Sequence, residues 1–459
     1  MDTSNSKIKD FTQGNISKQL IVFSLPLFLS NLLQVFYNMV DMIIVGNVMG
    51  ETGISAVSVG GDVTNLLMFM AIGFANAGQV LIAQYIGANK RENIGRFVGT
   101  MSGFLLVSAL VFTTIGIIFQ DLFLSLMNTP QVAFEGAAAY SLICIIGLVF
   151  IYGFNVVSAV LRGMGDSKHP FIFISIAAVL NVILDVVFVI YLDMGTAGAA
   201  LATVISQAVS FITCLIYLYK HKLDFSLDIT IKDFFIWNRE MLSDLVKLGI
   251  PMAIKMASVQ VSKLFVNAWV NVYGVAVSAF AGIANKMSSF SNLISAAMNT
   301  AGSTMVGQNI VAKKYDRVKK ILKNLSVITL AVSTLLSILI CVFPEETFSL
   351  FITEKDIGVL ELVDGYIPIA VLLFYAAALR AIMNALINGS GNYVVNFATA
   401  ILDGIVLRIG LSLLFGELLN MQYYGFWLGD ALAGFTPFWI GLIYYFTGAW
   451  KKPRKKEQN

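Results

Sequence analysis

The sequence predicts an all-α membrane protein with twelve transmembrane helices, arranged as two pseudo-symmetric lobes of six helices each. The composition, a series of long apolar segments and an internal repeat all favour this fold class. Of the 459 residues, 58% are hydrophobic and 12% are charged, and the mean hydropathy is +0.81. Because soluble proteins carry about 25% charged residues, the composition excludes a soluble protein.

Twelve apolar segments each contain the roughly 20 residues that a helix needs to cross a hydrocarbon core. They cover residues 20–46, 54–86, 97–119, 137–161, 170–191, 197–219, 244–272, 278–310, 324–343, 366–387, 394–415 and 424–449. After the sixth segment, a stretch of mixed charge interrupts the pattern and indicates a cytoplasmic linker. The predicted domains are an N-terminal lobe at residues 1–220, this linker at 221–243, and a C-terminal lobe at 244–459 with a basic tail.

One segment of the chain recurs 224 residues later in nearly the same form. The first copy contains Ala77-Gly78, Gln84, Ile86, Ala88 and Lys90, and the second contains Ala301-Gly302, Gln308, Ile310, Ala312 and Lys314. Pro26 and Pro251 match at an offset of 225, and Gly165 and Gly391 match at an offset of 226. A duplication that stays in register predicts a transporter whose substrate site lies between the halves.

Lysine and arginine are distributed unevenly among the predicted loops. If alternate helix ends face one side, 24 of the 30 Lys and Arg residues lie on the side of both termini, and the opposite loops hold only Lys355. Cytoplasmic loops retain positive charge, so we expect both termini in the cytoplasm and a multi-pass protein of the plasma (inner) membrane. Topology or anionic lipid explains the basic cluster Lys451–Lys456, and no nucleic-acid partner is expected.

The sequence has no motif typical of a metalloenzyme, an ATPase or a hydrolase. It contains two histidines and three cysteines, with no Walker-type phosphate loop and no nucleophile elbow. We therefore expect no enzyme and no cofactor, and a transport cycle driven by an ion gradient. Cys144, Cys214 and Cys341 fall in predicted spans and are expected to be packed thiols.

Ionisable side chains within the spans are the main functional candidates, because a buried charge in a bilayer costs on the order of several kcal/mol unless it has a partner or a wet cavity. Those of the first half are all acidic: Asp41, Asp62 and Asp185. Those of the second half are Lys255, Lys263, Lys286, Arg380, Arg408, Asp403 and Asp430. The first half therefore indicates a cation site, and the second half indicates a mixed-charge or anion-attracting wall.

Asp41 belongs to a polar stripe on the first span, with Gln34 and Asn38 at helical spacing from it. Pro26 removes one backbone hydrogen bond from the same helix and should bend it. Pro251 occupies the matching position of the second half, and we expect both prolines to act as helix hinges. A bend that can change beside a titratable carboxylate is a means of coupling ion binding to movement.

Asn181 and Asp185 are four residues apart and share a helix face, and Thr203 could add a hydroxyl oxygen. With Asp41, these groups supply hard oxygen ligands for Na⁺, or two carboxylates that share a proton. The alternative is a set of interhelical hydrogen bonds that only hold the lobe together.

Four groups of residues then occur in order along the first half. They are Phe23-Ser-Leu-Pro26 with Asp41 and Val45-Gly46, Leu161-Arg-Gly-Met-Gly-Asp166 with Pro170, Asn181-Val-Ile-Leu-Asp185, and Gly198-Ala-Ala-Leu-Ala-Thr203 with Ser206-Gln207. On the duplicated twelve-span plan, this order resembles the bacterial antiporters of the multidrug and toxic compound extrusion (MATE) family over nearly the whole chain.

The resemblance implies a V-shaped fold of two lobes that exports small organic, often cationic, compounds in exchange for Na⁺ or H⁺. It assigns the coupling ion to Asp41, Asn181, Asp185 and Thr203, with Tyr37 and Asn155 lining the same cavity. The seventh span has Lys255 and Lys263 where another branch of the family uses a glutamate. The chain is thus similar to the branch that lacks an acidic residue in helix 7.

The basic residues of the second half are not explained by this resemblance. Either they pair with Asp403 and Asp430 or extend to the membrane interface, or some of them face the cavity and favour anionic or zwitterionic substrates. The residues expected to line the substrate cavity are Gln34, Tyr37, Asn38, Asn155, Lys263 and Arg380.

Three functions stay open at this point: a cation-coupled exporter, a flippase for lipid-linked precursors on a related two-lobe plan, and a membrane-embedded enzyme. The acidic first half and the MATE resemblance favour the exporter. Its expected partners are small organic substrates and the lipid bilayer, and we expect it to function as a monomer.

Overall fold

The computed structural model describes residues 7–225, 227–229, 231–349 and 362–451. Regular structure within these ranges is helical, and they contain no strand. The all-α fold class is therefore confirmed. Lys355 and the tail residues 452–456, on which part of the topology prediction rests, lie outside the described residues.

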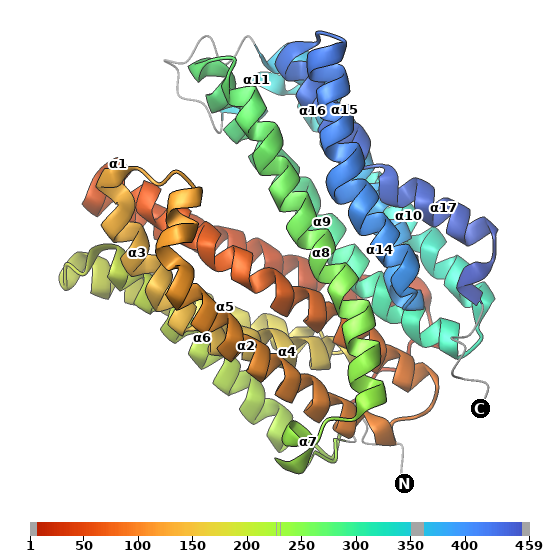
Figure 1. The fold of residues 1–459 in the computed structure, drawn as a ribbon. Coiled ribbons are helices and arrows are strands. Elements are labelled where there is room, and N and C mark those ends of the chain that lie inside the picture. The colour runs from red at the N-terminus through yellow and green to blue at the C-terminus, as the bar shows by residue number, and fades with distance from the viewer. Residues whose placement is uncertain (1–6, 226, 230, 350–361, 452–459) are drawn as a thin grey trace. The chain divides into compact units, whose positions relative to one another are not determined.

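The helices follow one another with short connections (Figure 1). The first half contains α1 (Ile16–Gly87), α2 (Glu92–Leu126), α3 (Gln131–Ile146), α4 (Leu148–Gly163), α5 (Lys168–Asp185), the π-helical turn η2 (Val186–Tyr191), α6 (Gly195–Lys220) and α7 (Ile231–Phe235). The second contains α8 (Arg239–Asn271), α9 (Val275–Val311), α10 (Tyr315–Val342), α11 (Pro344–Ser349), α13 (Val363–Ser390), α14 (Tyr393–Ile401), η3 (Leu402–Leu407), α15 (Arg408–Leu413), η4 (Leu414–Leu418), α16 (Gln422–Ala433), α17 (Thr436–Phe446) and η5 (Ala449–Lys451).

Nine helical stretches of the described chain are long and apolar enough to cross a membrane, and α3 with α4, bent by 50° at their junction, form a tenth. The long helix α1 is counted once, although Gly50 breaks it with a φ of 65° and a ψ of −153° that a residue with a Cβ rarely adopts. Its two parts correspond to two predicted spans. With the more polar α9, which has 37 residues, this makes the twelve predicted spans.

The chain forms two compact units. The first unit combines the residues up to Asp10 with Leu25–Ala253, and the second combines Phe11–Ser24 with the residues from Ile254 onward. The chain therefore passes between units next to Pro26 on α1 and next to Pro251 on α8. The helix α7 lies in the stretch predicted as the linker.

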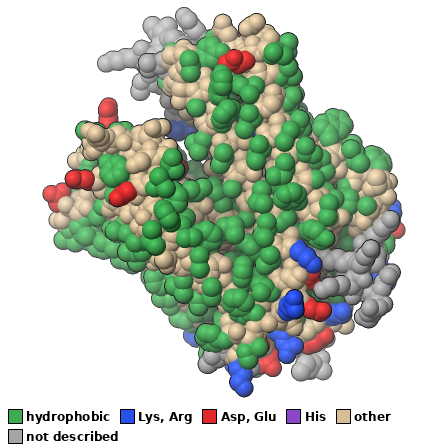
Figure 2. All heavy atoms as spheres, viewed as in Figure 1, with side chains coloured by type: hydrophobic (Ala, Val, Ile, Leu, Met, Phe, Trp, Pro, Cys, Tyr) green, Lys and Arg blue, Asp and Glu red, His purple; other side chains and the backbone are tan. Residues whose placement is uncertain are grey.

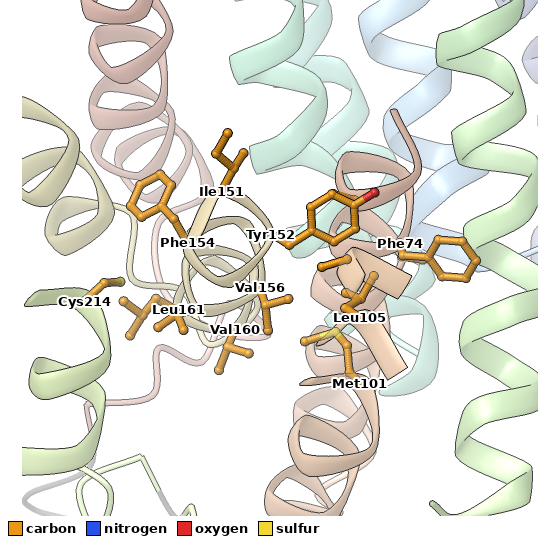
Figure 3. Close-up of a cluster of buried hydrophobic side chains, with 14 of the residues drawn as sticks. Phe74, Met101, Leu105, Ile151, Tyr152, Phe154, Val156, Val160, Leu161 and Cys214 are labelled. Atoms are coloured by element: carbon orange, nitrogen blue, oxygen red, sulfur yellow. The ribbon is translucent and has the colours of Figure 1, made fainter. Parts of the chain in front are cut away.

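Each unit has its own hydrophobic core. In the first unit, Phe74, Met101, Tyr152 and Cys214 come from four different helices and belong to one buried cluster (Figure 3). Tyr152 also donates a hydrogen bond of 2.7 Å from its hydroxyl to the carbonyl of Leu67, which satisfies its polar end in the apolar core.

The core of the second unit is rich in aromatic rings. Phe280 contacts Tyr366 and Trp427, with ring centroids 5.2 and 5.3 Å away, and stacks on Phe348 at 5.8 Å. Rings at these separations gain both buried area and favourable quadrupole contacts. This cluster fixes α9, α11, α13 and α16 against one another.

The repeat found in the sequence is present in the backbone. Asn89 and Lys313, 224 residues apart, both follow the ends of long helices with left-handed φ values of 58° and 57°. Gly165 and Gly391 likewise adopt φ values of 89° and 67°. The two halves therefore use the same turns at matching positions, although lysine is a poor residue for such a turn.

Helix packing repeats as well. A Cβ added at Gly163 would lie 2.9 Å from Ile82, and one added at Gly389 would lie 2.8 Å from Val306. Ile82 and Val306 are themselves 224 residues apart. Each half thus needs a glycine at the same helix crossing, because only glycine allows so close an approach.

The surface of the molecule is largely apolar. Figure 2 shows hydrophobic side chains over most of the visible face and Lys and Arg side chains gathered toward its lower edge. Cys144 and Cys214 are buried, but the expectation of a packed thiol is wrong for Cys341, which is exposed on α10. In a protein surrounded by lipid, a hydrophobic pattern does not tell a core position from a lipid-facing one, because both are apolar.

Candidate functional site

The helix α1 places a buried carboxylate inside the first unit. Asp41 lies one turn after Tyr37, and only 4% of its surface is exposed. Its Oδ1 atom accepts no hydrogen bond from the described residues. Because a buried carboxylate oxygen without a donor is costly, this position favours a bound cation or proton.

The helix α5 adds Asn181 and Asp185, which share one face of the helix and are 1% and 0% exposed. Within the described part of the chain, neither side-chain polar atom of Asn181 has a hydrogen-bond partner, and neither oxygen of Asp185 has one. Asp185 ends α5, and the π-helical turn η2 follows it directly. Such turns often occur at functional sites, since they redirect side chains.

Asp41 lies close enough to Asp185 to act electrostatically on its carboxylate. Two negative charges repel strongly in a low dielectric, so the pair is stabilised by a positive ion or a proton between them. No group of three or more His, Cys, Asp or Glu side chains in the described ranges could hold a metal ion. A Na⁺ ion here would thus need amide or hydroxyl oxygens besides the two carboxylates.

Hydroxyl and amide groups from α1, α3 and α6 lie near Asp41. Tyr37 lies beside Gln207 of α6, and Tyr140 of α3 lies beside Thr203 of α6. Both tyrosines are within electrostatic reach of Asp41. We call the group of Asp41, Asn181, Asp185, Thr203, Tyr37, Tyr140 and Gln207 the acidic site.

Comparison with known proteins identifies the family. The MatE family model matches residues 26–187 and, a second time, residues 251–414. The chain belongs to the MatE family. The double match also confirms the internal duplication, since the two matched regions begin at Pro26 and Pro251.

The relatives of this MatE protein include two from Bacillus subtilis. The probable multidrug resistance protein YpnP is 30% identical over 446 residues, which cover 97% of this chain and 98% of the relative. The probable multidrug resistance protein YoeA is 28% identical over 458 residues, which cover 98% of each. The predicted resemblance to the bacterial MATE proteins is therefore confirmed.

Solved structures share the MatE fold. A MOP superfamily transporter from Pyrococcus furiosus superposes with a TM-score of 0.89 at 22% sequence identity, covering 98% of this chain and 99% of that one. Its description states that the reverse polarity of its binding pocket suggests a different function. At this identity the likeness is one of fold.

The remaining predicted residues of the first unit have different surroundings in this MatE chain. Gln34 is half-buried and Asn38 is exposed, although both lie on the same helix as Asp41. Asn155 donates its amide to the carbonyl of Ile151 in its own helix at 2.8 Å. Asp62 is exposed.

Two predicted cavity residues, Lys263 and Arg380, belong to the second unit and are not part of the acidic site. Tyr140 and Gln207, in contrast, belong to the acidic site but were not predicted for it. Gln207 occurs in the motifs that carry the family resemblance, so it could have been included. Tyr140 had no such signal, because its position beside Thr203 depends on how α3 and α6 pack.

The second unit contains a buried ion-pair network. Arg408, which is 2% exposed, donates to Asp403 at 2.9 Å and also to Asp430. The expectation that basic residues pair with these two acids is therefore correct for Arg408. Lys255, Lys263 and Arg380 have no carboxylate within ion-pair distance among the described residues.

Proposed function

We propose that this MatE protein is a secondary active transporter that exports small organic compounds in exchange for Na⁺ or H⁺. The observation that carries this proposal is the acidic site, where buried oxygens of Asp41, Asn181 and Asp185 lack hydrogen-bond donors. Membership of the MatE family indicates a transporter rather than an enzyme, and the relatives are described as multidrug resistance proteins.

The coupling ion would bind between Asp41 and Asp185, with Asn181 and Thr203 as further oxygen ligands. Binding would neutralise two mutually repelling charges, and release of the ion would restore the repulsion. An ion that is needed in one conformation and expelled in another can drive substrate movement, because its binding free energy differs between the two states. The residues themselves suit both Na⁺ and H⁺.

Pro26 and Pro251 are the proposed hinges. Supporting this, the chain leaves one compact unit and enters the other between Ser24 and Leu25 and between Ala253 and Ile254. A proline inside a helix lacks one backbone hydrogen bond, so the helix bends there at little cost. Asp41 lies on the same helix as Pro26, which would link ion occupancy to the bend.

The remaining features of the proposal follow from sequence. The Lys and Arg distribution supports a plasma-membrane protein with cytoplasmic termini. The internal duplication supplies two related lobes, at residues 1–220 and 244–459, so one chain provides the symmetry that a transport cycle needs. We therefore propose that the monomer is functional.

Efflux from proteoliposomes tests the proposal. A fluorescent organic compound, a cation in one series and an anion in a second, is loaded, and either a Na⁺ gradient at equal pH or a pH gradient without Na⁺ is imposed. We expect one of the two gradients to drive export by the wild type and Asp41→Asn to reduce it to the level of empty liposomes, because the amide cannot carry the charge that binds the ion.

Asp62→Asn is the matched control, since it removes an exposed acid from the same helix. Its transport should equal that of the wild type. Gradient-driven export that persists at full rate in Asp41→Asn would overturn the proposed role of the acidic site. Export at the same rate with and without either gradient would overturn the proposal that the protein is an antiporter.

A further inference from the structure

Cationic side chains on α8, α13 and α15 of the second unit are buried or half-buried, and they are held in two different ways. Arg408 has two carboxylate partners, Asp403 and Asp430. Lys255, Lys263 and Arg380 have only neutral partners. Asp403 acts on all three, and Asp430 on Lys263 and Arg380, at longer range and beyond ion-pair distance.

The neutral partners are side chains on neighbouring helices. Lys255 of α8 donates to Oδ1 of Asn384 on α13 at 2.6 Å, and Lys263 of α8 donates to the hydroxyl of Ser288 on α9 at 3.2 Å. Asn384 and Ser288 are 7% and 8% exposed. The two lysines therefore point into the unit. They do not extend to the membrane interface, where a lysine of a membrane-spanning helix usually keeps its charge in water.

A short polar chain connects two of the cations. Arg380 of α13 donates to Oδ1 of Asn292 on α9, and the amide of Asn292 donates to the same Ser288 hydroxyl at 3.4 Å. Lys263 donates to this hydroxyl as well. Lys263 and Arg380 thus meet at one polar surface built from α8, α9 and α13, although they are 117 residues apart in the sequence.

Most of the donors on these cations are not used by the described protein groups. A lysine ammonium carries three N–H donors and a guanidinium five, whereas each of the three side chains donates one hydrogen bond to a neighbouring side chain among the described residues. Along α8 the two lysines are eight residues apart, or about 12 Å at 1.5 Å per residue. The surface therefore presents several charged donors over the length of a small organic molecule.

An unpaired cation in a protein interior is costly, and Arg408 demonstrates that this unit supplies two acids where a cation is paired internally. The segments of α8, α9 and α13 that carry these residues contain no Asp or Glu between 254 and 271, between 275 and 311, or between 365 and 390. A negative group from outside the protein would supply the missing charge.

We propose that Lys255, Lys263 and Arg380 form an anion-binding subsite that receives a carboxylate, sulfate or phosphate group of the exported compound. This inference rests on the proposed transport function and specifies its substrate class: organic anions, or zwitterions whose acidic group binds in the second unit. Arginine offers the paired donors that carboxylate and phosphate oxygens accept, and the lysines add compact charges.

Dye binding to the purified full-length protein in nanodiscs of neutral lipid tests the subsite without any gradient. The probes are a carboxylated fluorescein and a cationic rhodamine ester, which share one xanthene ring system. Fluorescence anisotropy should show binding of the fluorescein to the wild type, and at least ten-fold weaker binding to Lys263→Gln, Arg380→Gln and Lys255→Gln. Glutamine keeps a hydrogen-bond donor, so a purely structural role would survive the change.

Lys286→Gln is the matched control, because it removes an exposed lysine from α9; its affinity should be unchanged. Lys263→Arg should retain binding, since the charge remains, and it covers the case in which a glutamine variant fails to fold. Equal affinity of the fluorescein for the wild type and the glutamine variants would overturn the subsite, as would tighter binding of the rhodamine ester. Neither result would affect the Asp41 efflux test, so the two proposals fail separately.

A second arm separates a dissolved substrate from a lipid headgroup. Part of the neutral lipid is replaced with phosphatidylglycerol, whose headgroup is also a phosphate. Fluorescein affinity that stays constant supports a dissolved organic anion. Competition by this lipid that disappears in the glutamine variants would overturn that assignment and place a lipid headgroup on the three cations.

Discussion

The polar interiors of the two units are built on one backbone plan but carry opposite charge. In the first unit, Oδ1 of Asp41 and both carboxylate oxygens of Asp185 are buried without a hydrogen-bond donor among the described residues. In the second, Lys263 and Arg380 are held by neutral side chains, whereas Arg408 has two acidic partners. The two halves therefore share their turns and the helix crossings that need glycine, but they differ in the charge of their buried side chains.

The comparison also separates two ways of keeping charge inside a membrane protein. Arg408 has two carboxylate partners, Asp403 and Asp430, so its guanidinium needs no ligand. The acidic site and the three cations of the second unit are not balanced by neighbouring protein groups. A charge without a partner costs stability, so its retention indicates a function.

The largest effect on stability is expected at Arg408. Replacing it in Arg408→Gln leaves Asp403 and Asp430 buried without their cation, which should destabilise the second unit by about 3–5 kcal/mol. Thermal unfolding in detergent, followed by tryptophan fluorescence, should show a clear decrease in Tm. Adding Asp403→Asn and Asp430→Asn should restore much of the loss, because no charge is then left unpaired.

Asp41→Asn provides the contrast in the first unit. It removes a buried charge that has no donor at Oδ1, so its Tm should equal or exceed that of the wild type even though transport is lost. A strong decrease in Tm for Asp41→Asn, or none for Arg408→Gln, would contradict the distinction between a functional charge and a structural ion pair.

A smaller and symmetric effect is expected at the repeated helix crossings. In Gly163→Ala and Gly389→Ala, the new methyl group would meet Ile82 or Val306 at less than 3.0 Å. Overpacking of this kind costs about 1–3 kcal/mol, and both variants should lower Tm by similar amounts. A large difference between them would show that the two halves no longer share their packing.

The smallest effect concerns the left-handed turns after α1 and α9. Lys313→Gly should raise stability by at most about 1 kcal/mol, because a lysine with a φ of 57° is strained. Asn89→Gly should change Tm less, since asparagine tolerates a φ of 58°. Comparing the two Tm values tests this; a gain for Asn89→Gly alone would contradict the reasoning.

Most of the fold could be predicted from the sequence. Long apolar segments and the recurrence of Ala77-Gly78 as Ala301-Gly302 depend on composition and order alone, and both are visible in one chain. The break in α1 at Gly50 falls in the gap between two predicted segments. The exposed Cys341 was missed, because lipid-facing and buried positions are equally apolar.

The acidic site was only partly accessible from the sequence. Asn181 and Asp185 could be assigned to one site because they are four residues apart on one helix and share a face. Tyr140 could not be grouped with them, because its place beside Thr203 depends on the packing of α3 and α6. Gln207 could have been included, because it occurs in the motifs that carry the family resemblance. Lys263 and Arg380, predicted for the same substrate cavity as Tyr37, belong to the second compact unit, and their place in that cavity stays a prediction.

By itself the sequence determined the membrane class, the helix count, the duplication and the opposite charge of the two halves, because these properties follow from residue type and spacing. Only the tertiary structure decided which charges are neutralised. Arg408 meets both acids while Lys255, Lys263 and Arg380 meet amides and a hydroxyl, and these contacts join helices that are far apart in the chain. Whether two charges pair depends on distances of a few ångströms between side chains on different helices. The spacing of residues along one helix gives no information about those distances.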